Sequence, residues 1–223
     1  MSLFKRLFRK EDNSIVELSD VDFEKSKFKA RIALIDDEEI QHVKRLQKDG
    51  YNIVDYPDID NIDDFIRKKY HVVILDIQGI GKDLAGQNGG WGLLKYLKAE
   101  CPHIIVLMFT GADWSITKYK PLVDLADDFL GKDLEFLDFK SKLDSAIRKA
   151  FSPKFHFEIE KKKLLKELAN ADTLNKIESI IFQHGRKREK ALKEVKAIAP
   201  SGDVIKSIEN FLSITDKISE LFK

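Results

Sequence analysis

Residues 31–39 read RIALIDDEE, a short apolar run that ends in the acidic pair Asp36-Asp37. Three later apolar runs also end in polar side chains, and these ends are Asp76, Thr110 and Lys132. In an open parallel sheet the ligand crevice lies outside the carboxyl ends of the strands, so residues far apart in sequence become neighbours there. The sequence therefore predicts one pocket that contains three carboxylates, a hydroxyl and an ammonium group.

The side chains of this pocket indicate its chemistry. Asp36, Asp37 and Asp76 would repel one another at neutral pH unless they share a hard cation, and Mg²⁺ prefers a few carboxylates together with water and phosphate oxygens. A carboxylate beside a metal ion can attack a phosphoryl group, because the metal offsets the charge that develops. Lys132 and Thr110 offer an ammonium and a hydroxyl to the phosphoryl oxygens. We therefore expect an aspartyl phosphate that forms with Mg²⁺.

The stretches IALIDDEE, VVILDIQ, VLMFTG and ADDFLGKD resemble, in order and in separation, the signature stretches of the receiver domain of two-component response regulators. The resemblance implies a flavodoxin-like fold, which is a doubly wound, five-stranded parallel sheet, and a signalling switch rather than an enzyme. It implies that a sensor histidine kinase or a phosphotransfer protein is the partner that donates the phosphoryl group. The implied site residues are Asp76 as phosphoacceptor, Asp36, Asp37, Asp76 and the Gln78 backbone carbonyl for Mg²⁺, Thr110 and Lys132 for the phosphoryl group, and Phe129 as the switch aromatic.

Alternative roles for these residues fit the sequence less well. An aspartate that closes one apolar run is usually an ordinary strand-to-loop residue, but four polar ends in order make that role improbable for the whole set. The haloacid dehalogenase type of protein needs Asp-x-Asp after its first strand, whereas this chain has Asp-Asp-Glu at residues 36–38. No GxxxxGK[ST] or GxGxxG motif directly follows a predicted strand, which argues against nucleotide binding.

Two segments depart from the receiver pattern. Residues 77–90 are longer and richer in glycine than the corresponding loop and lack its proline, so we expect a mobile loop whose Lys82 or Gln87 reaches over the pocket as a lid. Asp133 follows Lys132 where receivers generally have a proline after a cis peptide bond. Because non-proline cis bonds cost about 3–4 kcal/mol, this bond is either trans or strained.

Alternating strand and helix patterns divide the chain into three parts. We predict an N-terminal extension at residues 1–30, a receiver domain at 31–151 and a helical output or interaction module at 152–223. The apolar runs predict strands near 31–35, 51–54, 72–75, 104–109 and 128–130. Helical spacing of apolar residues predicts helices at 38–49, 60–69, 91–100 and 134–150, and then at 156–169, 172–184, 187–198 and 203–222.

Charge and hydropathy set milder bounds. The chain of 223 residues has a net charge of +1, with an acidic predicted receiver and a mildly basic C-terminal part. No apolar run approaches the roughly 18 to 20 residues of a membrane span, so we expect a cytoplasmic protein. Residues 2–10 have apolar side chains at helical spacing among cations, namely Leu3, Phe4, Leu7 and Phe8. One interpretation is a peripheral contact with a membrane surface. We favour a segment that packs on this protein or on a partner, or that is disordered, because so short a helix is rarely stable by itself.

The C-terminal module leaves its partner open. Long apolar stripes on its helices favour a downstream protein partner that docks through residues 152–223. The basic run Gly185-Arg186-Lys187-Arg188 lies between two predicted helices and makes a DNA-binding transcriptional regulator an alternative, although the charge is modest for that role. A receiver-like scaffold that is never phosphorylated is a further alternative. A homodimer is compatible with every one of these functions.

Overall fold

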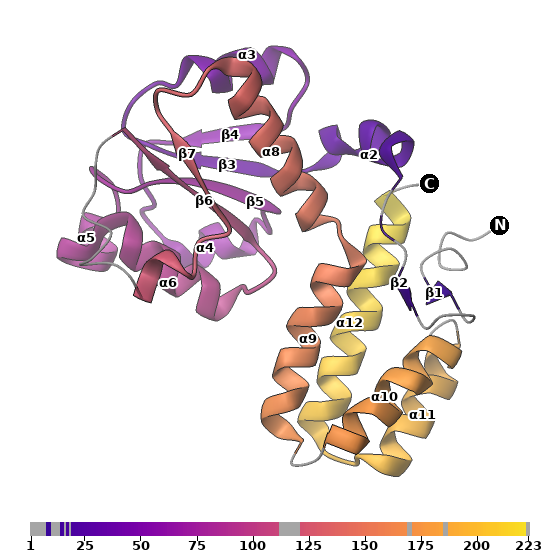
Figure 1. Ribbon diagram of the computed structural model, residues 1–223. Coiled ribbons are helices and arrows are strands. Elements are labelled where there is room, and N and C mark those ends of the chain that lie inside the picture. Colours follow the sequence, from indigo (N-terminus) through magenta and orange to yellow (C-terminus); the bar gives the residue numbers. More distant parts are fainter. Residues whose placement is uncertain are drawn as a thin grey trace. The chain divides into compact units, whose positions relative to one another are not determined.

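The computed structural model describes residues 8–9, 14–15, 17, 19–111, 121–168, 171–184 and 187–221 of the chain (Figure 1). The chain divides into two compact units. One unit comprises residues 24–150, and the other comprises residues 1–23 together with 151–223.

A five-stranded parallel sheet forms the centre of the first unit. Its strands are β3 (Ile32–Ile35), β4 (Ile53–Tyr56), β5 (Val72–Asp76), β6 (Ile105–Thr110) and β7 (Asp128–Gly131). They lie side by side in the order β4-β3-β5-β6-β7, so the first strand of the sheet lies between the second and the third. This is the strand order of flavodoxin-like folds, and the predicted fold class is confirmed.

Helices cover both faces of this sheet (Figure 1). The helices α3 (Gln41–Lys48) and α8 (Phe136–Ala150) lie on one face, and α4 (Ile62–Arg67) and α6 (Gly89–Glu100) lie on the other. Every side chain of β3 and β5 is buried, as expected for central strands of a parallel sheet with two covered faces. Alternate strand residues therefore contribute to two cores, one of which contains Ala33, Ile35, Val73, Leu75, Val106 and Met108 with Phe65, Trp91 and Leu97 of the helices.

The glycine-rich segment after β5 is more ordered than the predicted loop. It contains α5 (Lys82–Ala85) and the 3₁₀ turn η2 (Gly86–Asn88), and α6 begins at Gly89 rather than near Trp91. Ile80 is fully buried and fixes the start of the segment in the core. A Cβ atom at Gly90 would lie 2.0 Å from the backbone oxygen of Asp76, so only glycine allows α6 to begin this close to the end of β5.

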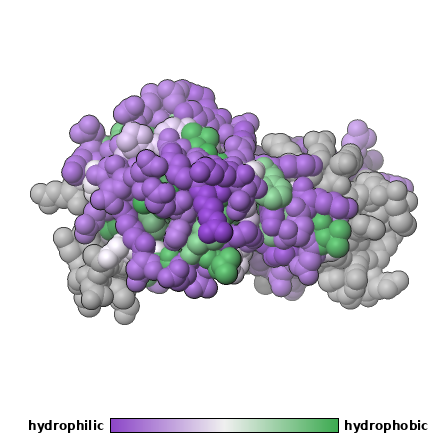
Figure 2. Space-filling model, turned by 90° about the horizontal axis from the view of Figure 1, so that it is seen from above, coloured by the Kyte–Doolittle hydropathy of each residue, from purple (hydrophilic) through white to green (hydrophobic). Residues whose placement is uncertain are grey.

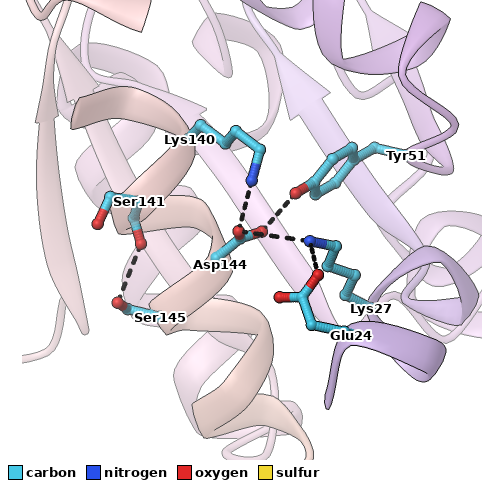
Figure 3. A network of polar contacts seen from close by, with 7 residues as sticks. All are labelled: Glu24, Lys27, Tyr51, Lys140, Ser141, Asp144 and Ser145. Atoms are coloured by element: carbon cyan, nitrogen blue, oxygen red, sulfur yellow. Dashed lines mark hydrogen bonds and ion pairs between the residues drawn. The ribbon is translucent and has the colours of Figure 1, made fainter. Parts of the chain in front are cut away.

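A network of polar contacts around Asp144 joins α8 to the segment that precedes the sheet (Figure 3). Asp144 accepts hydrogen bonds from Tyr51 Oη at 2.6 Å and from Lys140 Nζ at 2.8 Å. The buried ammonium of Lys27 lies 3.9 Å from Asp144 Oδ2 and 2.5 Å from Glu24 Oε2. Burial and the hydrogen bond to Asp144 raise the pKa of Tyr51 to about 12. The network connects Glu24, in the last turn of α2 (Asp20–Ser26), and Lys27 of the turn η1 (Lys27–Lys29) to the remainder of the unit.

The second unit contains four helices after residue 150. They are α9 (Pro153–Glu167), α10 (Ala171–His184), α11 (Arg188–Ile198) and α12 (Gly202–Leu221), each within three residues of a predicted helix. Helices α9 and α12 pack along each other, and α10 and α11 form a second pair (Figure 1). Phe157, Ile177, Val195, Ile208 and Phe211 are among the buried side chains of their shared core. The predicted all-α module is present.

The N-terminal segment gives little support for a helical anchor. Within residues 2–10 the structure describes Phe8 and Arg9, which form strand β1 (Phe8–Arg9) antiparallel to β2 (Ser14–Ile15). A helix therefore does not run through these two residues, and the rest of residues 2–10 lies outside the described part. On the face seen in Figure 2, the described residues are largely hydrophilic. Among the described residues, no helix combines the length and the apolarity that crossing a membrane requires.

Candidate functional site

The carboxyl ends of four neighbouring strands bring most of the predicted site residues together. Asp36 follows β3, Asp76 is the last residue of β5, Thr110 is the last residue of β6, and Lys132 follows β7. Asp36, Asp37 and Asp76 each offer a carboxylate oxygen, and these oxygens lie within 4.8 Å of one another. Asp36 and Asp76 are buried, whereas Asp37 is exposed to solvent. The cluster thus has two buried carboxylates and one carboxylate that solvent can reach.

Lys132 is the cation of this cluster. Its ammonium lies 3.0 Å from Asp36 Oδ2 and 3.5 Å from Asp76 Oδ2. The backbone holds it there, because the Lys132 amide donates a 2.7 Å hydrogen bond to the carbonyl oxygen of Thr110. Most of the Lys132 side chain is buried, and its ammonium also lies 5.3 Å from the centre of the Phe109 ring. Among the described residues the structure contains no cis peptide bond, so the Lys132-Asp133 bond is trans.

The charges of the cluster shift the pKa values of its members. Burial and the nearby Asp36 raise the pKa of Asp76 above its usual value, although Lys132 and the backbone amides of Ile77 and Gln78 act in the opposite direction. Burial alone would lower the pKa of Lys132, but the contact with Asp36 and the negative charge of Asp76 raise it. One ammonium therefore does not fully balance the buried carboxylates, and the site favours an additional positive charge.

Asp37 lies against the turn that follows β5. A Cβ atom at Gly79 would lie 2.6 Å from Asp37 Oδ2 and 2.8 Å from Asp37 Oδ1, and Gly79 has a φ of +80°. Gln78, whose backbone carbonyl is the predicted fourth Mg²⁺ ligand, precedes this glycine. The turn therefore sets both the orientation of Asp37 and the path of the backbone at Gln78.

Phe129, the predicted switch aromatic, lies in β7 and is partly buried. It packs against the same core as Trp91, and the two ring centres are 6.3 Å apart. Trp91 belongs to the first turn of α6, directly after the glycine that contacts the backbone of Asp76. The aromatic pair therefore connects β7 to the helix that begins beside the predicted phosphoacceptor.

Two carboxylates of the site edge were not predicted from the sequence. Glu38 Oε2 lies 3.5 Å from the Lys132 ammonium, and Asp58 accepts hydrogen bonds from the Gly81 amide at 2.8 and 3.0 Å. The sequence indicates Glu38 only by its position directly after the acidic pair Asp36-Asp37. Asp58 follows β4 by two residues, and the rule that identified the other strand ends would have found it if β4 had been placed at 53–56.

Of the two proposed lid residues, the structure describes the side chain of Lys82 alone, and it records no interaction between Lys82 and this cluster. Lys82 is the first residue of α5 and its side chain is exposed. The side chain of Gln87 lies outside the described part. The chemical capacity of the site thus rests on three carboxylates that could hold a hard divalent cation, one ammonium and one hydroxyl.

Receiver domains of response regulators are among the solved structures similar to this chain. The receiver domain of NtrX from Brucella abortus has a TM-score of 0.43 and 24% identity, over 52% of this chain and 97% of that chain. A structure of NtrX from the same organism in complex with ATP has a TM-score of 0.47 and 20% identity, over 76% of this chain and 40% of that chain. The receiver domain of a putative LuxO repressor protein from Vibrio parahaemolyticus has a TM-score of 0.46 and 21% identity, over 54% of this chain and 92% of that chain.

No protein-family model matches this sequence, and no curated protein matches it. The fold assignment therefore depends on the strand order and on the parallel pairing of all five strands.

Proposed function

We propose that the chain is a response-regulator signalling switch in which Asp76 accepts a phosphoryl group with the help of Mg²⁺. The observation that carries this proposal is the convergence of Asp36, Asp37 and Asp76, whose oxygens lie within 4.8 Å, beside the Lys132 ammonium. A purely structural strand end needs no such cluster, because it buries charge at a cost. A scaffold that is never phosphorylated would gain nothing from it.

The donor set fits a magnesium ion. Asp36, Asp37, Asp76 and the Gln78 backbone carbonyl would hold it, and these are oxygen ligands of the kind that Mg²⁺ prefers. The ion would offset negative charge as the phosphoryl group transfers. The raised pKa of Asp76 supports this fit, since the apoprotein has more buried negative charge than Lys132 balances.

Three side chains of this chain would then take part in the transfer of the phosphoryl group. A carboxylate oxygen of Asp76 forms the new bond to phosphorus, and the bond from phosphorus to the donor's leaving group breaks. Lys132 pairs with a phosphoryl oxygen, because its ammonium already lies 3.5 Å from Asp76 Oδ2 and needs only a small shift. The Thr110 hydroxyl donates to another phosphoryl oxygen from the adjacent strand end. The chain takes up a phosphoryl group and does not turn over a substrate.

The partners follow from this role. A sensor histidine kinase or a phosphotransfer protein would supply the phosphoryl group, and a downstream protein would bind through the helices of residues 152–223. The apolar core shared by α9 to α12 supports a folded interaction module. The basic run that motivated the DNA alternative includes Gly185 and Arg186, which lie outside the described residues.

Intact-mass measurement after incubation with acetyl phosphate and Mg²⁺ tests the proposal. The wild-type protein should gain the mass of one phosphoryl group, and Asp76→Asn should gain none. Asp128→Asn is a matched control, because Asp128 is exposed at the start of β7 and pairs with Lys142. Equal labelling of wild type and Asp76→Asn, or no labelling of the wild type with acetyl phosphate or phosphoramidate, would overturn the proposal.

A further inference from the structure

The backbone segment at residues 77–81, here called the strap, crosses the site at the carboxyl edge of the sheet. It begins after Asp76, and its Gly79 lies so close to Asp37 that an added Cβ would be 2.6 Å from a carboxylate oxygen. It ends at Gly81, where an added Cβ would lie 2.8 Å from Leu93 of α6. The strap therefore passes from β5 over the residues that follow β3, and both of its glycines are in close contact.

Asp58 holds the far end of the strap. Both of its carboxylate oxygens accept a hydrogen bond from the Gly81 amide, at 2.8 and 3.0 Å, and Oδ1 also accepts from the Ile59 amide at 2.7 Å. Hydrogen bonds to a charged acceptor are about twice as strong as those between neutral groups. Asp58 belongs to the turn after β4, which is the edge strand next to β3. The hydrogen bonds of Asp58 thus connect the strap, which begins after β5, to the turn after β4.

Gly81 lies where the strap meets a very short helix, in a backbone conformation that glycine adopts readily. Its φ is +68°, and it directly precedes α5, a helix of four residues that is too short to be stable by itself. The next buried anchor of the strap is Ile80, whose side chain is fully buried. Ile80 fixes the depth of the strap in the core, whereas the Asp58 carboxylate fixes its direction toward β4.

We infer that Asp58 is a positioning residue for the metal site, and this inference rests on the proposed function. Asp58 is not itself one of the clustered ligands, which are Asp36, Asp37 and Asp76. It acts through the strap, by keeping Gly79 against the Asp37 carboxylate and by fixing the backbone that carries the Gln78 carbonyl. Groups that orient metal ligands in this way typically contribute a factor of about 10 to 100 in metal affinity.

Two substitutions of Asp58 distinguish its hydrogen bonds to the strap from its negative charge as the cause of an effect on Mg²⁺ affinity. Asp58→Ala removes both acceptors of the Gly81 amide, whereas Asp58→Asn removes the charge but retains one acceptor oxygen. Asp60→Ala is the matched control, because it removes one negative charge from the same turn at an exposed side chain. The full-length proteins are compared by calorimetric titration with Mg²⁺ and by the exchange rate of the Gly81 amide measured by NMR.

Asp58→Ala should weaken Mg²⁺ binding by about tenfold or more and should speed exchange at Gly81. Asp58→Asn should retain most of the affinity, and Asp60→Ala should match the wild type. Unchanged affinity in Asp58→Ala, or an equal loss in Asp58→Ala and Asp60→Ala, would overturn the inference and leave the proposed function intact. A wild-type protein that binds no Mg²⁺ would overturn the proposed function, and the positioning role with it.

Discussion

Asp76 is a buried carboxylate whose pKa is raised by burial and by Asp36. Its side chain is only 7% exposed and is close to a second buried carboxylate, Asp36, and the Lys132 ammonium lies 3.5 Å away. The raised pKa means that the folded state holds the Asp76 proton more tightly than the unfolded state does. Because the native state binds more protons above the unfolded pKa, stability falls as the pH rises through the raised pKa of Asp76 and stays lower at neutral pH.

Asp76→Asn should therefore stabilise the protein at neutral pH in the absence of Mg²⁺. The amide keeps the shape of the carboxylate but carries no charge, and we expect a gain of about 0.5–2 kcal/mol in unfolding free energy, the usual range for stabilising substitutions. Urea denaturation at pH 7 with EDTA measures it. Added Mg²⁺ should stabilise the wild type and leave the variant nearly unchanged. A variant that is less stable than the wild type without Mg²⁺ would contradict this charge balance.

Gly79→Ala should damage the metal site more than it damages the fold. The new Cβ would meet the Asp37 carboxylate at 2.6 Å, so Asp37 must move and Mg²⁺ affinity should fall by about tenfold. Gly86→Ala provides the control, since Gly86 also has a positive φ of 58° but nothing lies within 4 Å of its added Cβ. Both variants incur backbone strain, of order 1–3 kcal/mol. Equal Mg²⁺ affinities in the two variants would exclude a specific effect of Gly79 on Asp37.

At the scale of elements, the starts of the strands are held by different contacts from their ends. His71 directly precedes β5, and its Nδ1 accepts a 2.9 Å hydrogen bond from the Arg31 amide just before β3. An accepting Nδ1 carries no proton, so this contact requires a neutral imidazole. Burial, together with the Arg31 charge, lowers the pKa of His71 to about 4.

His71 should make the protein less stable in mild acid. Between pH 6.5 and about 4 the unfolded chain takes up a proton at His71 that the native state does not, so the unfolding free energy falls as the pH is lowered. The loss should reach up to about 3 kcal/mol. His71→Asn keeps an acceptor for the Arg31 amide and removes the titration. As the pH falls from 7 to 4, the wild type should therefore lose up to about 3 kcal/mol of unfolding free energy relative to the variant, as measured by denaturation curves at several pH values. Curves that run parallel from pH 7 to 4 would exclude this role of His71.

Strands with continuous apolar runs were predictable, and the one strand without such a run was misplaced. Four of the five strands begin within one residue of their predicted starts. The edge strand β4 begins two residues later than predicted, because Tyr51 is buried by its contact with Asp144 rather than by pairing in the sheet. Asn52 and Asp55 interrupt the apolar residues of this region, so the apolar signal for β4 is weak.

The helical turns of the glycine-rich segment were not predicted, for a different physical reason. Low helix propensity at Gly89 and Gly90 favours a loop, yet these two residues are the first of α6. Close packing decides the outcome, since an added Cβ at Gly92 would lie 2.4 Å from the Cβ of Ala85. Strand ends were sufficient to predict that Asp36, Asp76, Thr110 and Lys132 lie at one edge of the sheet. Asp58 was missed because β4 was placed two residues too early, whereas Glu38 depends on the path of the loop after β3, which the apolar pattern does not specify.

At the scale of the whole molecule, the proposed switch requires that a change at Asp76 alter a surface that a partner binds. Phe129 is partly buried in β7, next to β6 that ends at Thr110, and packs against the core that contains Trp91. In the proposed switch, a shift of Thr110 toward a bound phosphoryl group would allow Phe129 to reorient. Residues 112–120, part of the surface expected to respond, lie outside the described residues. The helices of residues 156–222 are the expected readout.

Hydrogen exchange with and without beryllofluoride and Mg²⁺ tests this coupling. Beryllofluoride stands in for the phosphoryl group, and we expect protection to change at residues 111–127 and within 156–222. Asp76→Asn should show neither change. Unchanged protection in both ranges of the wild type would exclude the coupling. Duplex DNA binding that is salt-sensitive and increases with beryllofluoride would favour the transcriptional regulator instead.

The contacts of Asp144 have a consequence for any recombination of this receiver-like unit with another output module. Lys27 is buried and pairs with Glu24, and both residues precede the first strand of the sheet. A hybrid protein joined at residue 31 would discard that ammonium and leave Asp144 dependent on Tyr51 and Lys140. A junction before Glu24 would transfer the network intact. The transplantable part of this unit is therefore longer than its sequence motifs indicate.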